Sequence, residues 1–296
     1  MVPPMTARAG RQSAKGNVCM KGYSIPLSPE GRAGLYSKPP KRFGGRILSV
    51  VFKADRDALN ALIPAPLEPL DEPYGIVRVS ELLNDHGAGD KWLENEPEWV
   101  QYNEAVICIP ASYKGVVGNY DPYLWVDNHA CAAGGREIYG LPKKMAKVHL
   151  SRFYPSDPIG PGKKLTGTME GLSRRLITAS VKIEKEATPA DLPKVETFYA
   201  YRVLPDPEED RAEIEQLLEF RLKNYKYTKL YSGEGAVSFG DSPNEELIAL
   251  TPTEIIGGFY MEVDWLLPWP EILWDRDADR DEARGSKTAA LAGASR

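Results

Sequence analysis

The stretch Leu176–Glu184, LITASVKIE, has the clearest secondary-structure pattern in the chain. Apolar residues occupy every second position and polar residues the positions between them: Ile177, Ala179, Val181 and Ile183 alternate with Thr178, Ser180, Lys182 and Glu184. Successive side chains of a strand point to opposite faces of a sheet. The alternation therefore predicts an antiparallel strand with one buried and one solvated face.

Short apolar or β-branched runs on both sides of this stretch predict more strands. They cover residues 46–52, 76–83, 104–112, 120–127, 148–154, 165–169, 198–204 and 255–263. A short helix is expected after Asp55, which suits an N-cap position, and it must end before Pro64. Many strands without alternating helices favour a largely antiparallel sheet or barrel over a Rossmann domain.

Three segments have less decisive patterns. Residues 214–223 have an apolar spacing that fits either a helix or a strand. The run PWPEILW at 268–274 could start a closing helix, because proline suits the first helical turn. The polar segment 84–101 has the length of a functional lid or a disordered loop.

The two ends differ in composition from the rest of the 296-residue chain. Residues 1–30 contain no acidic residue before Glu30 and are expected to be a disordered leader; alternatively, translation starts at Met20. The charged, Ala-rich tail 276–296 is also expected to be disordered. Between them, a single domain over 31–275 is long enough to bury a full core.

Composition argues against several classes of protein. The net charge of −5, from 37 basic and 42 acidic residues, gives no electrostatic case for binding nucleic acid. No apolar run approaches the ~20 residues that a membrane-spanning helix needs. The three cysteines have no CxxC spacing and the three histidines lie far apart, so neither a disulfide framework nor a metal site is expected. Cysteine usage favours a reducing cytoplasm as the location.

Candidate chemistry gathers where Gly135-Arg136-Glu137 is followed by Pro142-Lys143-Lys144. The chain has no nucleotide-binding loop of the Walker or dinucleotide type and no GxSxG nucleophile motif. Paired lysines are usually solvated surface residues. The functional alternative is that one lysine is a nucleophile, because burial or a neighbouring cation lowers the pKa of an amine and frees its lone pair.

The stretch 132–144 (AAGGREIYGLPKK) resembles the signature of the acetoacetate decarboxylase family, in which a Gly-Arg-Glu turn precedes Pro-Lys-Lys. Four further stretches resemble the family in the same order along the chain: 55–67 (DRDALNALIPAPL), 120–128, 167–168 and 262–274 (EVDWLLPWPEILW). The resemblance covers roughly residues 40–275. It implies an α+β fold, with a mainly antiparallel sheet closed into a cone-shaped β-barrel, and assembly as a homo-oligomer.

The resemblance also implies roles for four residues. Lys143 matches the family's Schiff-base lysine; a lysine pKa lowered by its surroundings is an effect for which acetoacetate decarboxylase is the standard example. Glu104 matches one catalytic glutamate without gaps, and Glu81 matches a second after a one-residue shift. Arg46, again after a one-residue gap, matches the arginine that binds the substrate carboxylate.

Lys144, Tyr102 and Trp99 are further candidates for substrate binding. Adjacent side chains of an extended segment point to opposite faces, which would keep Lys144 out of a pocket that contains Lys143. Desolvation then explains a lowered Lys143 pKa better than charge repulsion does. Trp92 and Trp99, near Tyr102, suit core or interface packing as well as pocket lining. If they line the pocket, the substrate is larger than acetoacetate.

Through the resemblance, Lys143 would add to a ketone and lose water, giving a protonated imine that accepts electrons from a breaking carbon–carbon bond. We therefore expect a decarboxylase of a β-keto acid larger than acetoacetate, with no cofactor and no metal. The alternative is an imine-dependent aldolase, dehydratase or carbon–carbon lyase acting on a keto acid or aromatic carbonyl substrate. A further alternative is a non-catalytic barrel that binds a small ligand, although the presence of both Glu104 and Lys143 argues against it.

Overall fold

The computed structural model describes residues 20–87, 89–195 and 197–277, which fall into two compact units divided between Leu35 and Tyr36. In the first unit, Lys21 and Ser28 form an isolated antiparallel β-bridge. The expected leader lies mostly, and the expected tail almost wholly, outside the described residues.

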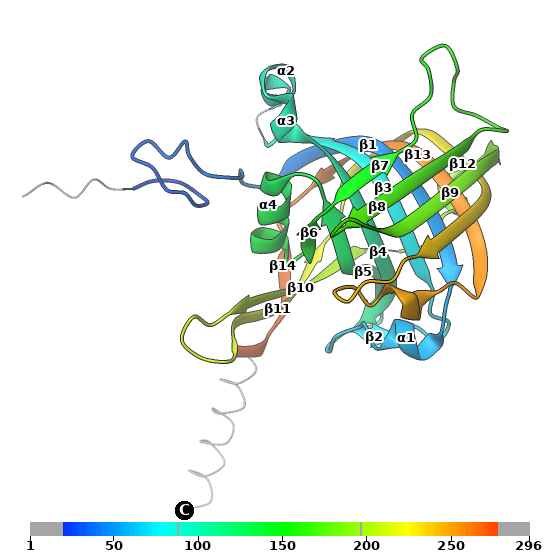
Figure 1. Cartoon of the computed structure of the whole chain (residues 1–296). Helices are drawn as coiled ribbons and strands as arrows, with labels where there is room; N and C mark the ends of the chain where they lie inside the picture. Colours follow the sequence, from blue (N-terminus) through cyan, green and yellow to red (C-terminus); the bar gives the residue numbers. More distant parts are fainter. Residues whose placement is uncertain (1–19, 88, 196, 278–296) are drawn as a thin grey trace, which may run out of the picture. The chain divides into compact units, whose positions relative to one another are not determined.

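Fourteen strands form one sheet in the described part of the second unit (Figure 1). Their bounds are β1 (Lys41–Lys53), β2 (Glu68–Pro69), β3 (Gly75–Asn84), β4 (Gln101–Tyr113), β5 (Val116–Val126), β6 (Lys143–Met145), β7 (Lys147–Leu150), β8 (Lys164–Gly171), β9 (Arg174–Glu186), β10 (Thr197–Pro205), β11 (Ala212–Phe220), β12 (Lys223–Phe239), β13 (Glu254–Leu267) and β14 (Glu271–Asp275). The helices are short: α1 (Arg56–Asn60), α2 (Lys91–Asn95), α3 (Pro97–Val100), α4 (His129–Tyr139) and the 3₁₀ turns η1 (Pro189–Asp191) and η2 (Leu247–Leu250).

The strand order is β14-β11-β10-β5-β4-β3-β1-β13-β12-β9-β8-β7, with β2 beside β4 and β6 beside β5. Neighbouring strands are antiparallel, except that β5 runs parallel to β10 and to β6. The prediction of a mainly antiparallel sheet with few helices is confirmed. The end strands β7 and β14 do not pair in the described structure, so closure into a cone-shaped barrel stays a prediction.

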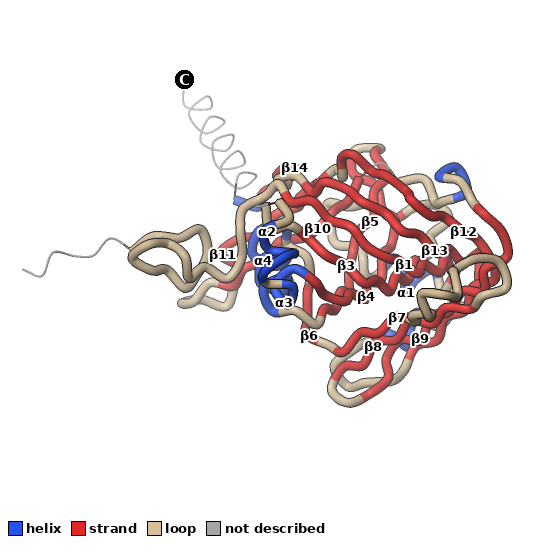
Figure 2. Tube along the Cα trace, turned by 90° about the horizontal axis from the view of Figure 1, so that it is seen from above, coloured by secondary structure: helices blue, strands red, loops and turns tan. Residues whose placement is uncertain are grey.

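The sheet curls back on itself, so that β7 and β8 pack against β3 (Figure 2). The core lies between the two layers. The four alternating apolar residues of the LITASVKIE stretch, and Leu176 before them, are buried in this core. They pack there with side chains from β1, β3 and β8, among them Leu48, Val50, Val77, Val79, Leu165 and Met169. The alternation predicted from the sequence of β9 is therefore confirmed.

Two less decisive segments are strands. Residues 214–223 lie mostly in β11, so the strand interpretation is correct. The prediction of a closing helix at 268–274 was wrong, because Glu271–Asp275 pairs as β14 with the edge of β11, where Trp274 stacks on Tyr201. The predicted N-cap is confirmed, since the Asp55 carboxylate accepts a hydrogen bond of 2.9 Å from the Ala58 backbone N–H.

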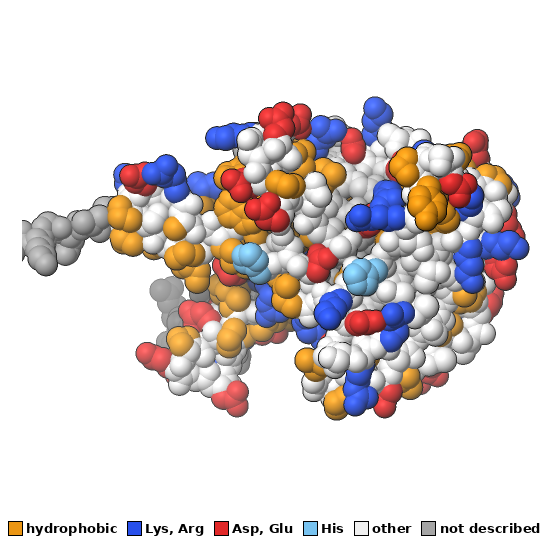
Figure 3. Space-filling view, turned by 45° about the horizontal axis from the view of Figure 1, so that its top comes forward, with side chains coloured by type: hydrophobic (Ala, Val, Ile, Leu, Met, Phe, Trp, Pro, Cys, Tyr) orange, Lys and Arg blue, Asp and Glu red, His pale blue; other side chains and the backbone are white. Residues whose placement is uncertain are grey.

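The segment 84–101 contains the short helices α2 and α3. No helix in the described part of the chain is long and apolar enough to cross a membrane. On the face of the molecule shown in Figure 3, acidic and basic side chains are interspersed.

Candidate active site

Lys143 is the first residue of β6, directly after α4 and the turn that closes it. Helix α4 begins where the Asn128 side chain accepts a hydrogen bond of 2.9 Å from the Cys131 N–H, and it ends at Gly140, which has a φ of 70°. Gly135, inside α4, faces the Lys143 side chain: a Cβ there would lie 2.5 Å from Lys143 Cδ. The glycine-rich sequence of this helix therefore leaves room for the lysine.

The Lys143 side chain is 6% exposed and its ammonium has two close partners. Its Nζ lies 3.0 Å from Glu104 Oε2, on β4, and 3.0 Å from Cys131 Sγ, on α4. The Tyr102 ring centroid lies 5.4 Å from the same nitrogen. The structure thus brings together Lys143 and Glu104, as the resemblance to the family predicts. It adds Tyr102, which the aromatic residues near it made a candidate for substrate binding, and Cys131.

The charge on Lys143 is set by opposing effects. Burial lowers the pKa of its ammonium, but the electrostatic effects of Cys131 and Glu104, together with their hydrogen bonds to Nζ, outweigh burial, so that the pKa is raised above its ordinary value. The expectation of a pKa lowered by desolvation was wrong, because it ignored the two acidic neighbours. Lys143 must therefore transfer a proton before it can attack a carbonyl, and Glu104 is close enough to accept it.

A second lysine lies close by. Lys41, at the start of β1, is 7% exposed and lines a small cavity of about 40 Å³ together with Cys131 and Lys143. Burial, together with the positive charge of Lys143, lowers the pKa of Lys41 to about 8. Sequence reasoning missed Lys41, because the predicted strand 46–52 begins after it and nothing in the nearby sequence indicates burial.

Lys143 and Glu104 line an inner cavity of about 120 Å³. Its walls are mainly apolar and come from strands far apart in the sequence, with Phe43, Ile47, Leu124, Phe220 and Trp265 among them. The other charged groups in its lining are Arg78 and Asp121. A second, outer cavity of about 410 Å³ shares Ile47, Arg78, Phe198, Leu222 and Tyr225 with the inner one.

Asp121, on β5, is 7% exposed, and its Oδ1 has no hydrogen-bond partner among the described residues. Burial raises the pKa of this carboxyl to about 6. Hydrogen bonding to Cys108 and the positive charge of Arg78 act in the opposite direction without cancelling burial. Asp121 can therefore be protonated or ionised near neutral pH, as a group that exchanges protons requires.

Replacing Asp121 with asparagine is expected to stabilise the protein at high pH. Because the folded-state pKa, about 6, exceeds the ordinary value of 3.8, stability from this group is present below pH 3.8 and lost as the pH rises through 6. The full difference corresponds to about 3 kcal/mol. Urea unfolding at pH 4 and pH 8 should show Asp121→Asn gaining about 2 kcal/mol relative to the wild type. A gain that does not change with pH would contradict a raised pKa.

Glu81 and Arg46 lie on the opposite face of the sheet from Lys143. Arg46 of β1 pairs in register with Glu81 of β3, and their side chains form an ion pair. Arg152 Nε donates a second hydrogen bond of 2.7 Å to Glu81. Both predicted positions were wrong for the inner cavity, because a shift of one residue along a strand moves a side chain to the other face. Their neighbours Ile47 and Ser80 line the inner cavity instead.

Two other expected substrate contacts also lie outside both cavities. Lys144 Nζ is 2.6 Å from Glu245 Oε2 and lies over the Trp125 ring, since adjacent residues of β6 point in opposite directions. The Trp99 ring stacks on the His86 ring with centroids 5.5 Å apart. The Trp92 and Trp99 rings pack edge to face with centroids 4.9 Å apart. The 84–101 tryptophans therefore pack on their own segment, and they give no argument for a large substrate.

Sequence reasoning missed Arg78, Asp121 and Cys131. The first two had a usable signal, since each is a charged residue inside a mainly apolar strand, in IVRVSELL and YDPYLWV respectively. A charged residue in a buried strand is rarely placed there without a partner or a function. Cys131 had no such signal, because its closeness to Lys143 depends on how α4 packs.

The curled, mainly antiparallel sheet is the fold of the acetoacetate decarboxylase-like proteins of known structure, and here its apolar cavity contains a lysine–glutamate pair. The chain belongs to the acetoacetate decarboxylase family, whose model, described as acetoacetate decarboxylase (ADC), matches residues 24–276. It is 30% identical over 264 residues to an acetoacetate decarboxylase from Paraburkholderia xenovorans strain LB400, covering 88% of this chain and 94% of that protein.

Solved structures with the same fold include the following two. An acetoacetate decarboxylase-like enzyme from Sphingomonas wittichii RW1 aligns with a TM-score of 0.80 and 21% identity, covering 86% of this chain and 99% of its own. The enduracididine biosynthesis enzyme MppR, solved with the condensation product of pyruvate and imidazole 4-carboxaldehyde, aligns with a TM-score of 0.76 and 25% identity, covering 87% and 98% respectively. The fold therefore occurs both in a protein similar to decarboxylases and in one that holds a condensation product.

Proposed function

We propose that this protein is a decarboxylase that forms a Schiff base between Lys143 and a β-keto acid larger than acetoacetate. The observation that carries the proposal is the 3.0 Å contact between the Lys143 ammonium and the Glu104 carboxylate inside an apolar cavity. The larger substrate is supported by the outer cavity, which adjoins the inner one. Assembly as a homo-oligomer in the cytoplasm stays a prediction.

Proton transfer from Lys143 to Glu104 gives a neutral amine that adds to the ketone carbon. The carbinolamine then takes up a proton and loses water, leaving a protonated imine. The bond to the carboxylate carbon breaks, carbon dioxide leaves, and its bonding electrons pass into the imine to give an enamine. Protonation of the enamine carbon and addition of water release the ketone and restore the amine, so that atoms and charges balance.

The apolar walls support this reaction. In the imine the substrate carries a negative carboxylate and a positive nitrogen, and both charges disappear as carbon dioxide leaves. A medium of low polarity solvates the charged reactant poorly and the less charged transition state better, so that it lowers the barrier. Phe43, Ile47, Leu124 and Trp265 supply such surroundings beside Lys143.

An imine-dependent aldolase or dehydratase is the second candidate. MppR, 25% identical to this chain, was solved with a condensation product of pyruvate and an aldehyde. The same enamine that follows decarboxylation can attack an aldehyde, and Asp121, with a pKa of about 6, could supply or accept a proton in that step. The two candidates therefore share Lys143 and differ in what leaves or joins the substrate.

A panel of carbonyl substrates is expected to separate the two candidates. The wild-type protein should release one carbon dioxide for each β-keto acid consumed, with kcat/KM for a six-carbon substrate at least about 10-fold above acetoacetate, because additional methylenes fill apolar space. Carbon dioxide release and product mass would be measured in parallel. A pyruvate–aldehyde adduct formed without carbon dioxide release would favour the aldolase, and faster turnover of acetoacetate would contradict the larger substrate.

A further inference from the structure

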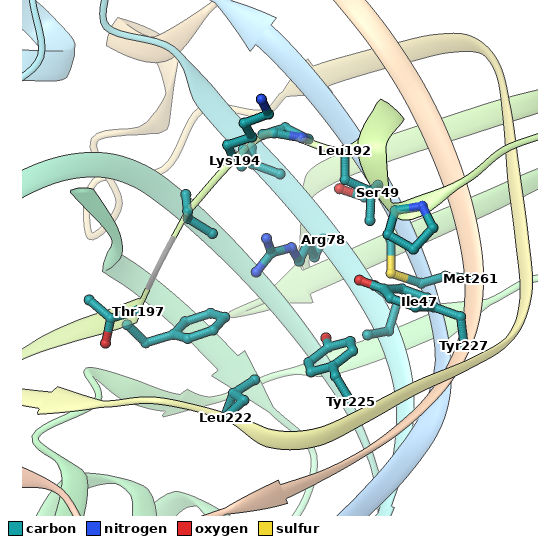
Figure 4. A pocket seen from close by; sticks show the side chains of 15 residues that line it. Ile47, Ser49, Arg78, Leu192, Lys194, Thr197, Leu222, Tyr225, Tyr227 and Met261 are labelled. Atoms are coloured by element: carbon teal, nitrogen blue, oxygen red, sulfur yellow. The ribbon is translucent and has the colours of Figure 1, made fainter. Parts of the chain in front are cut away.

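The outer cavity lies directly beside the inner one, with Arg78 in the wall of both. Figure 4 shows the Arg78 side chain reaching into the outer cavity among Tyr225, Thr197 and Lys194. Strand β3 places Arg78 two residues before Ser80, which pairs with Glu104 on β4. Arg78 and Ser80 therefore share a face of the sheet, and their backbones are about 7 Å apart along the strand.

Arg78 is a half-buried cation that forms no ion pair with another described residue, although its charge acts on the Asp121 carboxyl in the same inner cavity. None of the described residues places a carboxylate within 4.0 Å of its guanidinium, although arginines elsewhere in the chain are commonly paired in this way. Its recorded contacts are weak: Nη1 lies 3.5 Å from Cys108 Sγ, and the guanidinium carbon lies 6.0 Å from the Phe198 ring centroid. A guanidinium keeps its charge at all physiological pH values, so this one is available to bind an anion.

We propose that Arg78 and the outer cavity form a binding site for a second carboxylate, which the substrate keeps throughout the reaction. The substrate class would then be an oxo diacid, with its ketone at Lys143 and its distal acid group at Arg78. The proposal rests on the proposed function for the position of the ketone. Lys194, which is exposed and lines the same cavity, adds a second positive charge at the rim.

Arg78 suits a retained carboxylate better than a departing one. A departing carboxylate loses its charge in the transition state, so an ion pair with Arg78 would stabilise the bound substrate more than the transition state and slow the reaction. A retained carboxylate has the same charge in both states, so the ion pair holds the substrate without opposing bond cleavage. The apolar inner cavity is left to the carboxylate that departs.

The size of the two cavities agrees with this division. The inner cavity, about 120 Å³, has room for a keto group and its immediate neighbours, whereas the outer cavity, about 410 Å³, can take a longer substituent. The spacing along β3 suits an acid group two or three methylenes from the ketone carbon. The tyrosines that line the outer cavity, Tyr225 and Tyr227, have hydroxyl groups that can donate to a carboxylate.

The test compares 3-oxoadipate with 3-oxohexanoate, which has a methyl group in place of the distal carboxylate. Wild-type kcat/KM should favour the diacid by at least about 10-fold, and Arg78→Gln should lower the diacid-to-monoacid ratio by about 10- to 100-fold. Arg78→Lys should give an intermediate ratio, because it keeps the charge and loses the bidentate geometry. Arg175→Gln, at an exposed arginine of β9, is the matched control and should keep the wild-type ratio.

Binding of glutarate, which cannot form an imine, would be measured by calorimetry on the wild type and Arg78→Gln, with melting curves to verify folding. Glutarate should bind the wild type at least about 10-fold more tightly than the variant.

Labelling of the wild type by acetone and borohydride tests Lys143 separately. The carboxylate site alone would be overturned if Lys143 is labelled but Arg78→Gln leaves either glutarate binding or the diacid-to-monoacid ratio unchanged. Arg78-dependent glutarate binding without labelling by any carbonyl compound would support the site and overturn the proposed imine.

Discussion

Lys143→Ala is expected to abolish both turnover and the covalent adduct that borohydride fixes between the protein and a ketone. Only an amine can form the imine, and Lys143 is the amine that lies 3.0 Å from Glu104 in the inner cavity. Loss of a nucleophile that no other group replaces removes most of the rate enhancement, on the order of 10⁴-fold or more. Intact mass and peptide mapping after incubation with acetone and reduction by borohydride would locate the adduct.

Lys41 makes this experiment decisive. Its pKa is lowered to about 8, so at pH 8 a larger fraction of Lys41 than of Lys143 is neutral amine. If the pKa alone decided which lysine forms the imine, it would be Lys41. Geometry favours Lys143, because the described structure gives Lys41 no carboxylate partner for proton transfer. An adduct on Lys41, or one that survives Lys143→Ala, would contradict the mechanism. Lys144→Ala is the control, since Lys144 faces Glu245 outside the cavities and its loss should leave labelling intact.

The sheet could be predicted from the sequence because most of its strands carry a local signal. The alternation in 176–184 depends on one buried face, which β9 has. The error at 268–274 arose because a proline-containing run can start a helix or extend an edge strand, and the free edge of β11 decided between them. Such tertiary pairing has no trace in a short window of sequence.

The candidate site was predictable only where the spacing to Lys143 was free of gaps. Glu104 meets that condition and contacts the lysine, whereas Glu81 and Arg46, each placed after a shift of one residue, lie on the other face of the sheet. Because side chains alternate between the two faces of a strand, a register error of one residue places the side chain on the opposite face of the sheet from the site. Residues carried over across a gap in a strand therefore need the structure.

The pKa of Lys143 could not be predicted from the sequence at all. Burial and charged neighbours change an amine pKa in opposite directions, and their balance depends on distances of a few ångströms between α4, β4 and β6. Arg78 shows the same limit. Its strand could be predicted, but its position in the wall of two cavities depends on segments more than a hundred residues away in the chain, including β12.

Glu104→Gln is expected to lower kcat by on the order of 10²-fold or more, the usual contribution of a group that transfers protons. Glutamine keeps the size of the side chain and can accept the hydrogen bond from Lys143, so the melting temperature at pH 8 should change little. The variant loses the charge of Glu104, one of the two neighbours that raise the Lys143 pKa, so this pKa should fall. Stability that depends on charged Lys143 should then be lost at lower pH than in the wild type.

Glu104→Gln should favour imine formation by lowering the Lys143 pKa and slow turnover by removing the group that transfers protons. Measuring both steps therefore separates proton transfer from a structural role. A lower Lys143 pKa increases the fraction of neutral amine, so borohydride labelling by acetone should persist in the variant at pH 8, whereas the slower protonation and dehydration steps should still limit turnover. Labelling rates and kcat, each measured from pH 6 to pH 10, would show this. A variant that loses labelling and turnover together, with a lower melting temperature, would mean that Glu104 holds Lys143 in place and that another group, such as Asp121, moves the proton.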